Sequence, residues 1–192
     1  ASPVYGGAQI AIAHAAREHG ARATIFCAKR GKPHPCTMEA NAAGAKIVQV
    51  PHGYLSNVKA KAKAYCAKTG AYMLPFGLDC DLANQAIAER ARLAQAQIVD
   101  RINQVWCVGG SGVLCRGLQL GLRADSFHVV QIGRQLKPED VQKAKIYVSK
   151  QDFAVDAKKP PPFPSCSNYD AKAWEFICAH RQGTALFWNV MG

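Results

Sequence analysis

The feature that most constrains the fold is a glycine-rich stretch near the middle of the chain, where residues 105–114 read VWCVGGSGVL. The apolar run before the glycines is typical of a buried strand, and the apolar spacing after them is typical of a helix. A strand that ends on glycines and restarts as a helix presents backbone N–H groups at the positive end of the helix dipole. We therefore predict that Gly109, Gly110, Ser111 and Gly112 form a phosphate-binding loop. The alternative is a tight strand-to-helix turn that binds no ligand.

The composition of the chain is that of a globular protein. It has 192 residues, of which 49% are hydrophobic and 19% are charged, so it suits one α/β domain or two small lobes. No apolar run approaches the roughly 20 residues that a membrane-spanning helix needs, and the first residues lack the layout of a signal peptide. We expect a cytoplasmic protein without a membrane segment.

The cysteines and histidines show no pattern of a metal or hydrolytic site. Eight cysteines are spread along the chain without a CxxC pair, so we expect no metal site. Cys27 and Cys107 lie in apolar strand patterns, where a free cysteine behaves as a small core residue, and we expect reduced, mostly structural thiols. The six histidines are scattered and no GxSxG sequence accompanies them, so we expect surface or packing roles for them.

The chain is strongly basic, with 24 lysines and arginines against 13 acidic residues and a net charge of +11. Such a charge favours an anionic partner, either a phosphorylated small molecule or a nucleic acid. Lys59, Lys61 and Lys63 are spaced so that they spread around a helix and form no single stripe. A solvated surface is the alternative explanation for the charge.

Apolar periodicity predicts an alternation of strands and helices over most of the chain. We expect helices at residues 8–19, 37–43, 55–68, 82–98, 113–122 and 171–180, and strands at 23–28, 46–50, 72–74, 104–108, 127–132 and 185–188. The prolines in 156–167 exclude regular helix there. Near-continuous apolar strands that alternate with helices are typical of parallel sheets. The predicted fold is therefore a three-layer α/β fold, in which parallel sheets are flanked by helices on both faces.

The expected division of the chain is into two lobes. Residues 1–75 form a small lobe of incomplete βα units. Residues 76–192 form a larger lobe, which holds the glycine loop and closes with the last helix and strand.

Three stretches in one order along the chain carry a resemblance to a known family. They are YGGAQ at residues 5–9, GGSG at 109–112 and NYDAKAW at 168–174, the last followed by ALFW at 185–188. Together they resemble the fold-type-II pyridoxal-phosphate (PLP) enzymes, which are tryptophan synthase β-like. Within that family the chain is most similar to the aminocyclopropane-carboxylate deaminase and D-cysteine desulfhydrase branch, including its phage-type members. The passage MEANAAGAKIV at 38–48 is similar to the family's helix–Gly–Ala–strand passage.

The resemblance implies that PLP is the cofactor and that the first two stretches bind ligands. The substrate carboxylate would be bound by the loop of Tyr5, Gly6, Gly7 and Ala8. Gln9 would lie beside the pyridine ring, and the glycine loop would bind the cofactor phosphate. The residues alone also allow a plainer explanation, in which Gln9 is a polar residue at a helix N-terminus.

The resemblance also implies roles for two residues of the third stretch. Tyr169 would act as an acid, base or nucleophile near the reacting carbon. Asp170 would pair with the pyridine nitrogen and favour a carbanion at Cα. The plainer explanation is that the two residues start a helix, with Asp170 as its N-cap or first-turn acid.

The chain departs from the family at one important point. The lysine that bonds to the cofactor lies upstream of the loop that corresponds to residues 5–9, and no lysine precedes Lys29 in this chain. Lys29 and Lys32 follow the expected strand at 23–28 in a basic loop and look like surface residues. We therefore expect a chain that is N-terminally truncated, that receives the missing segment from another chain, or that has lost this chemistry. Smaller departures are Ala171 in place of a family glycine and the ending NVMG at 189–192.

The leading hypothesis is a PLP-dependent lyase or deaminase-like enzyme, or a fragment of one. It would act at Cα of a small amino-acid-like substrate by deamination, elimination or decarboxylation, and an amino-acid-modified base in DNA would suit the basic charge. The alternative is a non-catalytic descendant that binds an anionic ligand or nucleic acid. A nucleotide or phosphoribosyl transferase ranks last, because Cys115 and Arg116 stand where a Walker motif has lysine and serine or threonine. A homodimer is the default assembly.

Overall fold

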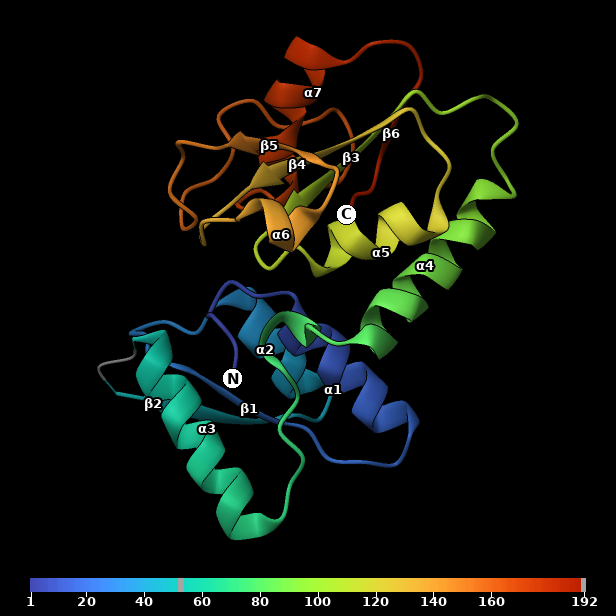
Figure 1. The fold of residues 1–192 in the computed structure, drawn as a ribbon. Helices are drawn as coiled ribbons and strands as arrows, with labels where there is room; N and C mark the ends of the chain where they lie inside the picture. Colours follow the sequence, from blue (N-terminus) through green and yellow to red (C-terminus); the bar gives the residue numbers. More distant parts are fainter. Residues whose placement is uncertain (52–53, 191–192) are drawn as a thin grey trace. The chain divides into compact units, whose positions relative to one another are not determined.

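The computed structural model describes residues 1–51 and 54–190, and the chain divides into two units, Ala1–Gly77 and Leu78–Gly192. Each unit is built around its own parallel sheet (Figure 1). Because parallel strands must be joined by crossovers, helices separate the strands along the chain.

The first unit holds a two-stranded sheet between helices. Its elements are α1 (Ala8–Glu18), β1 (Thr24–Ala28), α2 (Pro35–Ala42), β2 (Lys46–Val50) and α3 (Leu55–Thr69). β1 and β2 are parallel, and Thr24 pairs with Lys46. Side chains alternate between the two faces of a strand, so Ile25 and Ile47 pack with α1 and α2, whereas Phe26 packs with α3.

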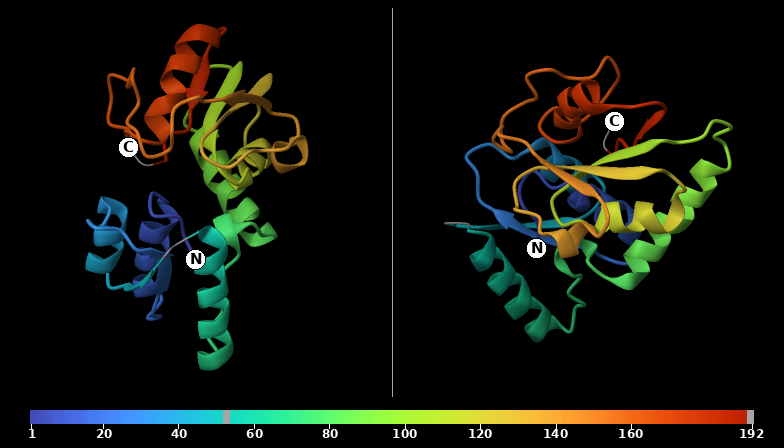
Figure 2. Two further views of the ribbon diagram at one scale, coloured as in Figure 1. Left: turned by 90° about the vertical axis from the view of Figure 1, so that its left-hand side faces the viewer. Right: turned by 45° about the horizontal axis from the view of Figure 1, so that its top comes forward.

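The second unit holds a four-stranded sheet whose order is β5-β4-β3-β6 and whose strands are all parallel (Figures 1 and 2). Its elements are α4 (Asp81–Gln95), β3 (Gln104–Gly109), α5 (Val113–Gly121), β4 (Ser126–Gln131), α6 (Pro138–Val141), β5 (Lys145–Val148), the 3₁₀ helix η2 (Asp170–Ala173), α7 (Trp174–His180) and β6 (Ala185–Phe187). A short 3₁₀ helix, η1 (Phe76–Leu78), precedes α4.

The alternation along β3 separates the two cores of the second unit. Val105 and Cys107 face a core shared with α4, α5 and α6, and Trp106 and Val108 face a core shared with η2 and α7. This arrangement confirms the predicted fold class, in which helices flank parallel sheets on both faces.

Two glycines allow α5 to approach α4 closely. A Cβ atom on Gly117 would lie 2.5 Å from Cβ of Ile87, and one on Gly121 would lie 2.6 Å from Cβ of Ala91. Both distances are far below a normal contact. The two small residues, four positions apart, therefore lie on the side of α5 that meets α4.

The structure corrects several expected elements. Residues 72–74 form no strand, and Tyr72 is 82% exposed. The run is only three residues long and is followed by Pro75, and no strand within residues 1–51 and 54–190 pairs with it. The expected helix at 171–180 begins as the 3₁₀ helix η2, and the last strand is only half-buried. α6 and β5 were not predicted, because each is only four residues long.

Two kinds of feature are absent from the described residues. None of the helices in residues 1–51 and 54–190 combines the length and apolar character needed to cross a bilayer. The same part of the chain contains no group of three or more histidine, cysteine, aspartate or glutamate side chains that could hold a metal ion.

Candidate functional site

The predicted glycine loop joins the end of β3 to the start of α5. β3 is an internal strand of its sheet, ends at Gly109, and is followed by α5 from Val113. The loop therefore lies at the carboxyl edge of a parallel sheet, which is where open α/β sheets bind their ligands.

The glycines of the loop serve different purposes. A Cβ atom on Gly109 would lie 2.7 Å from Cγ2 of Val129, and Gly112 has φ +85° and lies so close to the Asp140 carbonyl that a Cβ atom would overlap it. Packing therefore requires glycine at both positions. Gly110 is different, because its nearest neighbour would be the Tyr169 hydroxyl at an ordinary 3.4 Å.

Gly110 and Ser111 supply the part of the loop that can meet a ligand. Both are half-buried, whereas Gly109 and Gly112 are buried. The Ser111 hydroxyl makes no hydrogen bond to any residue that the structure describes. α5 follows with nine residues, and its first N–H groups lie at the positive end of the helix dipole. These donors fit a phosphate group.

The side chain of Tyr169, which directly precedes η2, lies next to this loop. Its ring lies 5.5 Å from that of Phe153, and its hydroxyl is hydrogen-bonded to the backbone of Gly110. Burial, and then the charge of Asp170, raise the pKa of Tyr169 well above its usual range, and the bond from Gly110 opposes them only in part. The phenol therefore stays neutral at physiological pH and holds its proton at the loop.

Asp170 lies behind Tyr169 as the first residue of η2 and is 0% exposed. The plainer expectation of a first-turn acid describes this position. Because the side chain has no exposed surface, it acts here on its neighbours: its charge contributes to the raised pKa of Tyr169. Pairing of Asp170 with a pyridine nitrogen stays a prediction.

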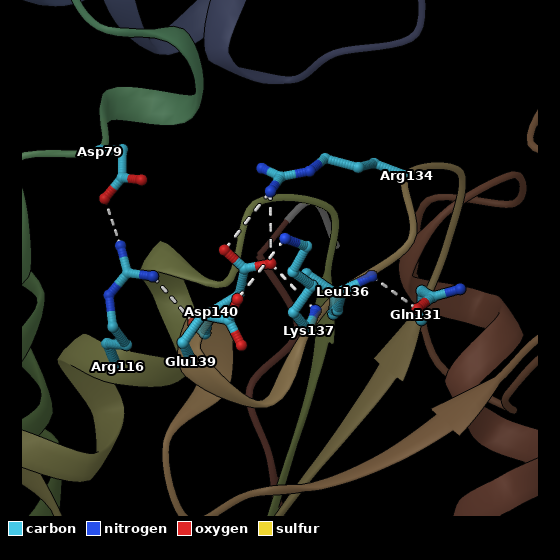
Figure 3. Close-up of polar contacts among 8 residues, drawn as sticks. All are labelled: Asp79, Arg116, Gln131, Arg134, Leu136, Lys137, Glu139 and Asp140. Carbon is cyan, nitrogen blue, oxygen red and sulfur yellow. Dashed lines mark hydrogen bonds and ion pairs between the residues drawn. The ribbon is translucent and has the colours of Figure 1, made fainter.

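A network of charged residues braces the loop from the α6 side (Figure 3). The Asp140 carboxylate accepts bonds from the Arg134 guanidinium at 3.3 and 3.4 Å and from the Lys137 backbone N–H at 3.0 Å. Arg116 donates to the Asp140 carbonyl at 2.8 Å and forms an ion pair with Asp79. Arg116, which stands at one of the two Walker positions, therefore links α5 to α6 and to the segment before α4.

Lys172 is a buried lysine for which the sequence pattern predicts no role. It is 1% exposed, and its Nζ donates to the Asp152 carbonyl at 2.6 Å. Burial lowers its pKa, and the nearby carboxylates of Asp152 and Asp156 act in the opposite direction. Its amine thus ties η2 to the loop that follows β5, whereas Lys29 and Lys32 are exposed, as expected.

The first unit contains the other predicted loop, at the start of α1. Gly7 precedes the helix, and its carbonyl accepts from Ile10 N–H at 3.0 Å. Tyr5 packs its ring edge-on against His34, with ring centres 4.8 Å apart. A Cβ atom on Gly6 would lie 2.8 Å from Oγ of Ser2 and 3.2 Å from the Pro3 carbonyl oxygen, so the turn is tightly packed there. Residues 5–8 are half-buried, and carboxylate binding by them stays a prediction.

Gln9 is 0% exposed, and its amide is used inside the first unit. Its Nε2 donates to the carbonyls of Pro3 and Val4 at 3.0 and 2.9 Å, and its Oε1 accepts from Thr37 Oγ1 at 3.1 Å. Both amide protons are therefore committed to the backbone of the loop. The observed geometry makes Gln9 a support for the loop, and its place beside a cofactor ring stays a prediction.

Comparisons with known proteins identify the fold. No protein-family model and no curated protein matches the sequence. Solved structures do match: a threonine deaminase from T.th. has a TM-score of 0.69 at 19% identity, over 98% of this chain and 75% of that one. Diaminopropionate ammonia lyase from Escherichia coli has a TM-score of 0.71 at 14% identity, over 100% of this chain and 64% of that one. O-acetyl serine sulfhydrylase isoform 3 from Entamoeba histolytica has a TM-score of 0.70 at 12% identity, over 100% and 68%.

These likenesses establish a fold-type-II architecture and, at such identities, the fold alone. The chain spans between 64% and 75% of the length of these three structures, and between 39% and 43% of two serine racemases that it also matches. Membership of the aminocyclopropane-carboxylate deaminase branch stays a prediction.

Proposed function

We propose that this chain forms the cofactor-phosphate site of a PLP-dependent enzyme that acts at Cα of an amino acid. The observation that carries the proposal is the loop of Gly110 and Ser111 at the start of α5, with the neutral Tyr169 phenol beside it. A threonine deaminase and a diaminopropionate ammonia lyase share the fold, which supports a reaction that removes an amino group.

Each residue of the site has a defined task in this proposal. The N–H groups at the start of α5 and the Ser111 hydroxyl bind the phosphate, and the helix dipole of α5 stabilises its charge. Tyr169 holds a proton on Oη at the loop and is the general acid. Asp170 lies next to Tyr169 in the sequence, and its charge adds to the effect of burial in raising the pKa of the phenol. Bound PLP would supply the electron sink for a carbanion at Cα.

The first experiment tests the phosphate cradle without needing a lysine. Deoxypyridoxine phosphate lacks the aldehyde and cannot bond covalently to an amine, so its affinity reports the non-covalent site. We expect binding by the purified chain, measured by calorimetry, and loss of about tenfold or more in affinity for Ser111→Asp, because a carboxylate would face the phosphate. The matched control is Ser56→Asp, which adds the same charge at an exposed position of α3.

Two results decide the proposal. Binding that is lost in Ser111→Asp and kept in Ser56→Asp supports a phosphate site at the loop. Equal affinity in the two variants, or no binding to a folded wild-type chain, would refute it.

The net charge of the chain narrows the proposed class of substrate. A net charge of +11 supports an amino acid attached to a base in DNA, because phosphate contacts need lysine and arginine. We expect a short duplex to bind with an affinity that falls steeply with salt. Salt-sensitive duplex binding without any binding of deoxypyridoxine phosphate would favour the non-catalytic alternative.

A further inference from the structure

The α7-facing side of the second unit's sheet changes character along its strands. Toward the carboxyl ends it carries apolar side chains such as Val108 and Val130. Toward the amino ends it carries a polar row, because His128 pairs in register with Trp106 on one side and with Lys145 on the other. A polar row on a sheet face that a helix covers carries a desolvation cost unless its groups are bonded or meet a ligand.

The buried part of this row is held rigidly. His128 is 7% exposed and stacks on Trp106, with ring centres 4.3 Å apart. Its Nε2 lies 2.8 Å from Oγ of Ser126, and its Nδ1 lies 3.2 Å from the Tyr147 hydroxyl. Beside it, the Gln104 Oε1 accepts from Trp106 Nε1 at 3.1 Å. These bonds fix the orientation of the imidazole and of the phenol.

A cavity of about 230 Å³ lies next to these residues, at the end of α7. We refer to it as the amino-end pocket; it is lined by Gln104, His128, Lys145, Tyr147, Ala179, His180, Arg181 and Gln182. The lining includes lysine, arginine and two histidines and no acidic side chain. Neither Lys145 nor Arg181 forms an ion pair with any residue of the described ranges 1–51 and 54–190.

No acidic side chain lines the pocket to balance its positive charge, and this charge acts on His128. Burial, and then the charges of Lys145 and His180, lower the pKa of the His128 imidazole. The groups that face the imidazole are the Trp106 ring from β3, Ser126 from its own strand, Lys145 and Tyr147 from β5, and His180 from α7. An anion in the pocket would offset this repulsion.

We propose that the amino-end pocket binds a phosphate dianion, either free or as a small phosphate monoester. Lys145 and Arg181 supply the charge. The Tyr147 hydroxyl donates to the anion while it accepts from His128 Nδ1, so a protonated His128 strengthens the site. The pocket is separate from the glycine loop, because Gln104 begins β3 and Gly109 ends it, which places them about 16 Å apart along the strand.

The test follows the ring signals of His128 by NMR during titration with inorganic phosphate. We expect saturable shifts and a rise in the pKa of His128 as phosphate binds. The double variant K145Q/R181Q should weaken phosphate binding by about tenfold or more. The control K143Q/K158Q removes two positive charges at exposed positions outside the pocket and should bind phosphate as the wild type does.

Further measurements distinguish the pocket from the glycine loop and a monoester from free phosphate. Ser111→Asp should leave the His128 shifts intact, because it alters only the glycine loop. Glycerol phosphate should shift His128 if the pocket accepts monoesters, and inorganic phosphate alone would define a site for the free ion. If K145Q/R181Q does not fold, the single variant Arg181→Gln replaces it, because Arg181 is exposed; it should also weaken phosphate binding. A silent His128, or an equal loss of affinity in K143Q/K158Q, would overturn the proposal.

Discussion

The hydroxyl oxygen of Tyr169 lies 3.4 Å from the point where a side chain on Gly110 would begin. The two residues are far apart in the sequence, yet the phenol and the backbone of the loop form one surface. Because the Gly110 backbone is hydrogen-bonded to the phenol, the loop and the start of η2 set each other's position.

Gly112→Ala and Gly110→Ala should differ sharply in stability. Gly112 has φ +85° and faces the Asp140 carbonyl, so alanine there adds strain and overlap, and we expect a loss of about 2 kcal/mol or more. Gly110→Ala meets only ordinary contacts and should cost less than about 1 kcal/mol. Urea unfolding measures both, and equal losses would show that the loop has another conformation.

The raised pKa of Tyr169 should make the protein sensitive to alkali. The unfolded chain releases the phenol proton near its ordinary value of 10.0, whereas the folded protein retains it. The unfolded state then binds fewer protons, so stability is fully present below about pH 10 and falls above it, by up to about 1.4 kcal/mol per pH unit. Tyr169→Phe should remove this part of the slope. Unfolding curves at several alkaline pH values for both proteins provide the measurement, and parallel slopes would contradict the assignment.

Gly121→Ala should separate α5 from α4. Its new methyl group would lie 2.6 Å from Cβ of Ala91, and overpacking of this kind costs about 1–3 kcal/mol. Gly31→Ala is the matched control, because nothing lies within 4 Å of its Cβ position, and it should change stability by less than about 1 kcal/mol. A thermal melt of the two variants distinguishes them. A neutral Gly121→Ala would mean that the two helices are farther apart in solution.

The thiols should react in the order of their exposure. Cys178 is exposed, whereas Cys107 and Cys115 are each 1% exposed. A hydrogen bond with Cys115, followed by burial, raises the pKa of the Cys107 thiol, so it has little reactive thiolate. Iodoacetamide under native conditions should label Cys178 first and leave the buried pair unlabelled, as mass spectrometry of peptides would show. Rapid labelling of Cys107 would place it on an open surface.

Local patterns were sufficient to predict the regular core of the fold. β2 (Lys46–Val50) has its predicted bounds, and β3 and α5 differ from theirs by one residue. These elements have long apolar runs or clear helical spacing, bounded by glycine. Residues 72–74 carried the same apolar signal but lack a strand to pair with, and α6 and β5 are too short for a period to emerge.

The site was only partly predictable for a physical reason. The glycine loop is a local feature, since both its strand and its helix adjoin it. The polar row around His128 depends on strand register, which pairs His128 with Trp106 and with Lys145. The only local signal was that His128 lies in an apolar run, and for the histidines we expected either a surface or a packing role. The buried state of Gln9 depends on Thr37, which belongs to another helix.

The bond from Thr37 to Gln9 links the loop at residues 3–7 to a helix that is distant in the sequence. Gln9 joins the carbonyls of Pro3 and Val4 to a hydroxyl 28 positions away, at the start of α2. The shape of the loop at residues 3–7 is thus decided partly by a side chain that lies outside it. A substitution at Thr37 would therefore change the shape of the loop without any change in the residues that form it.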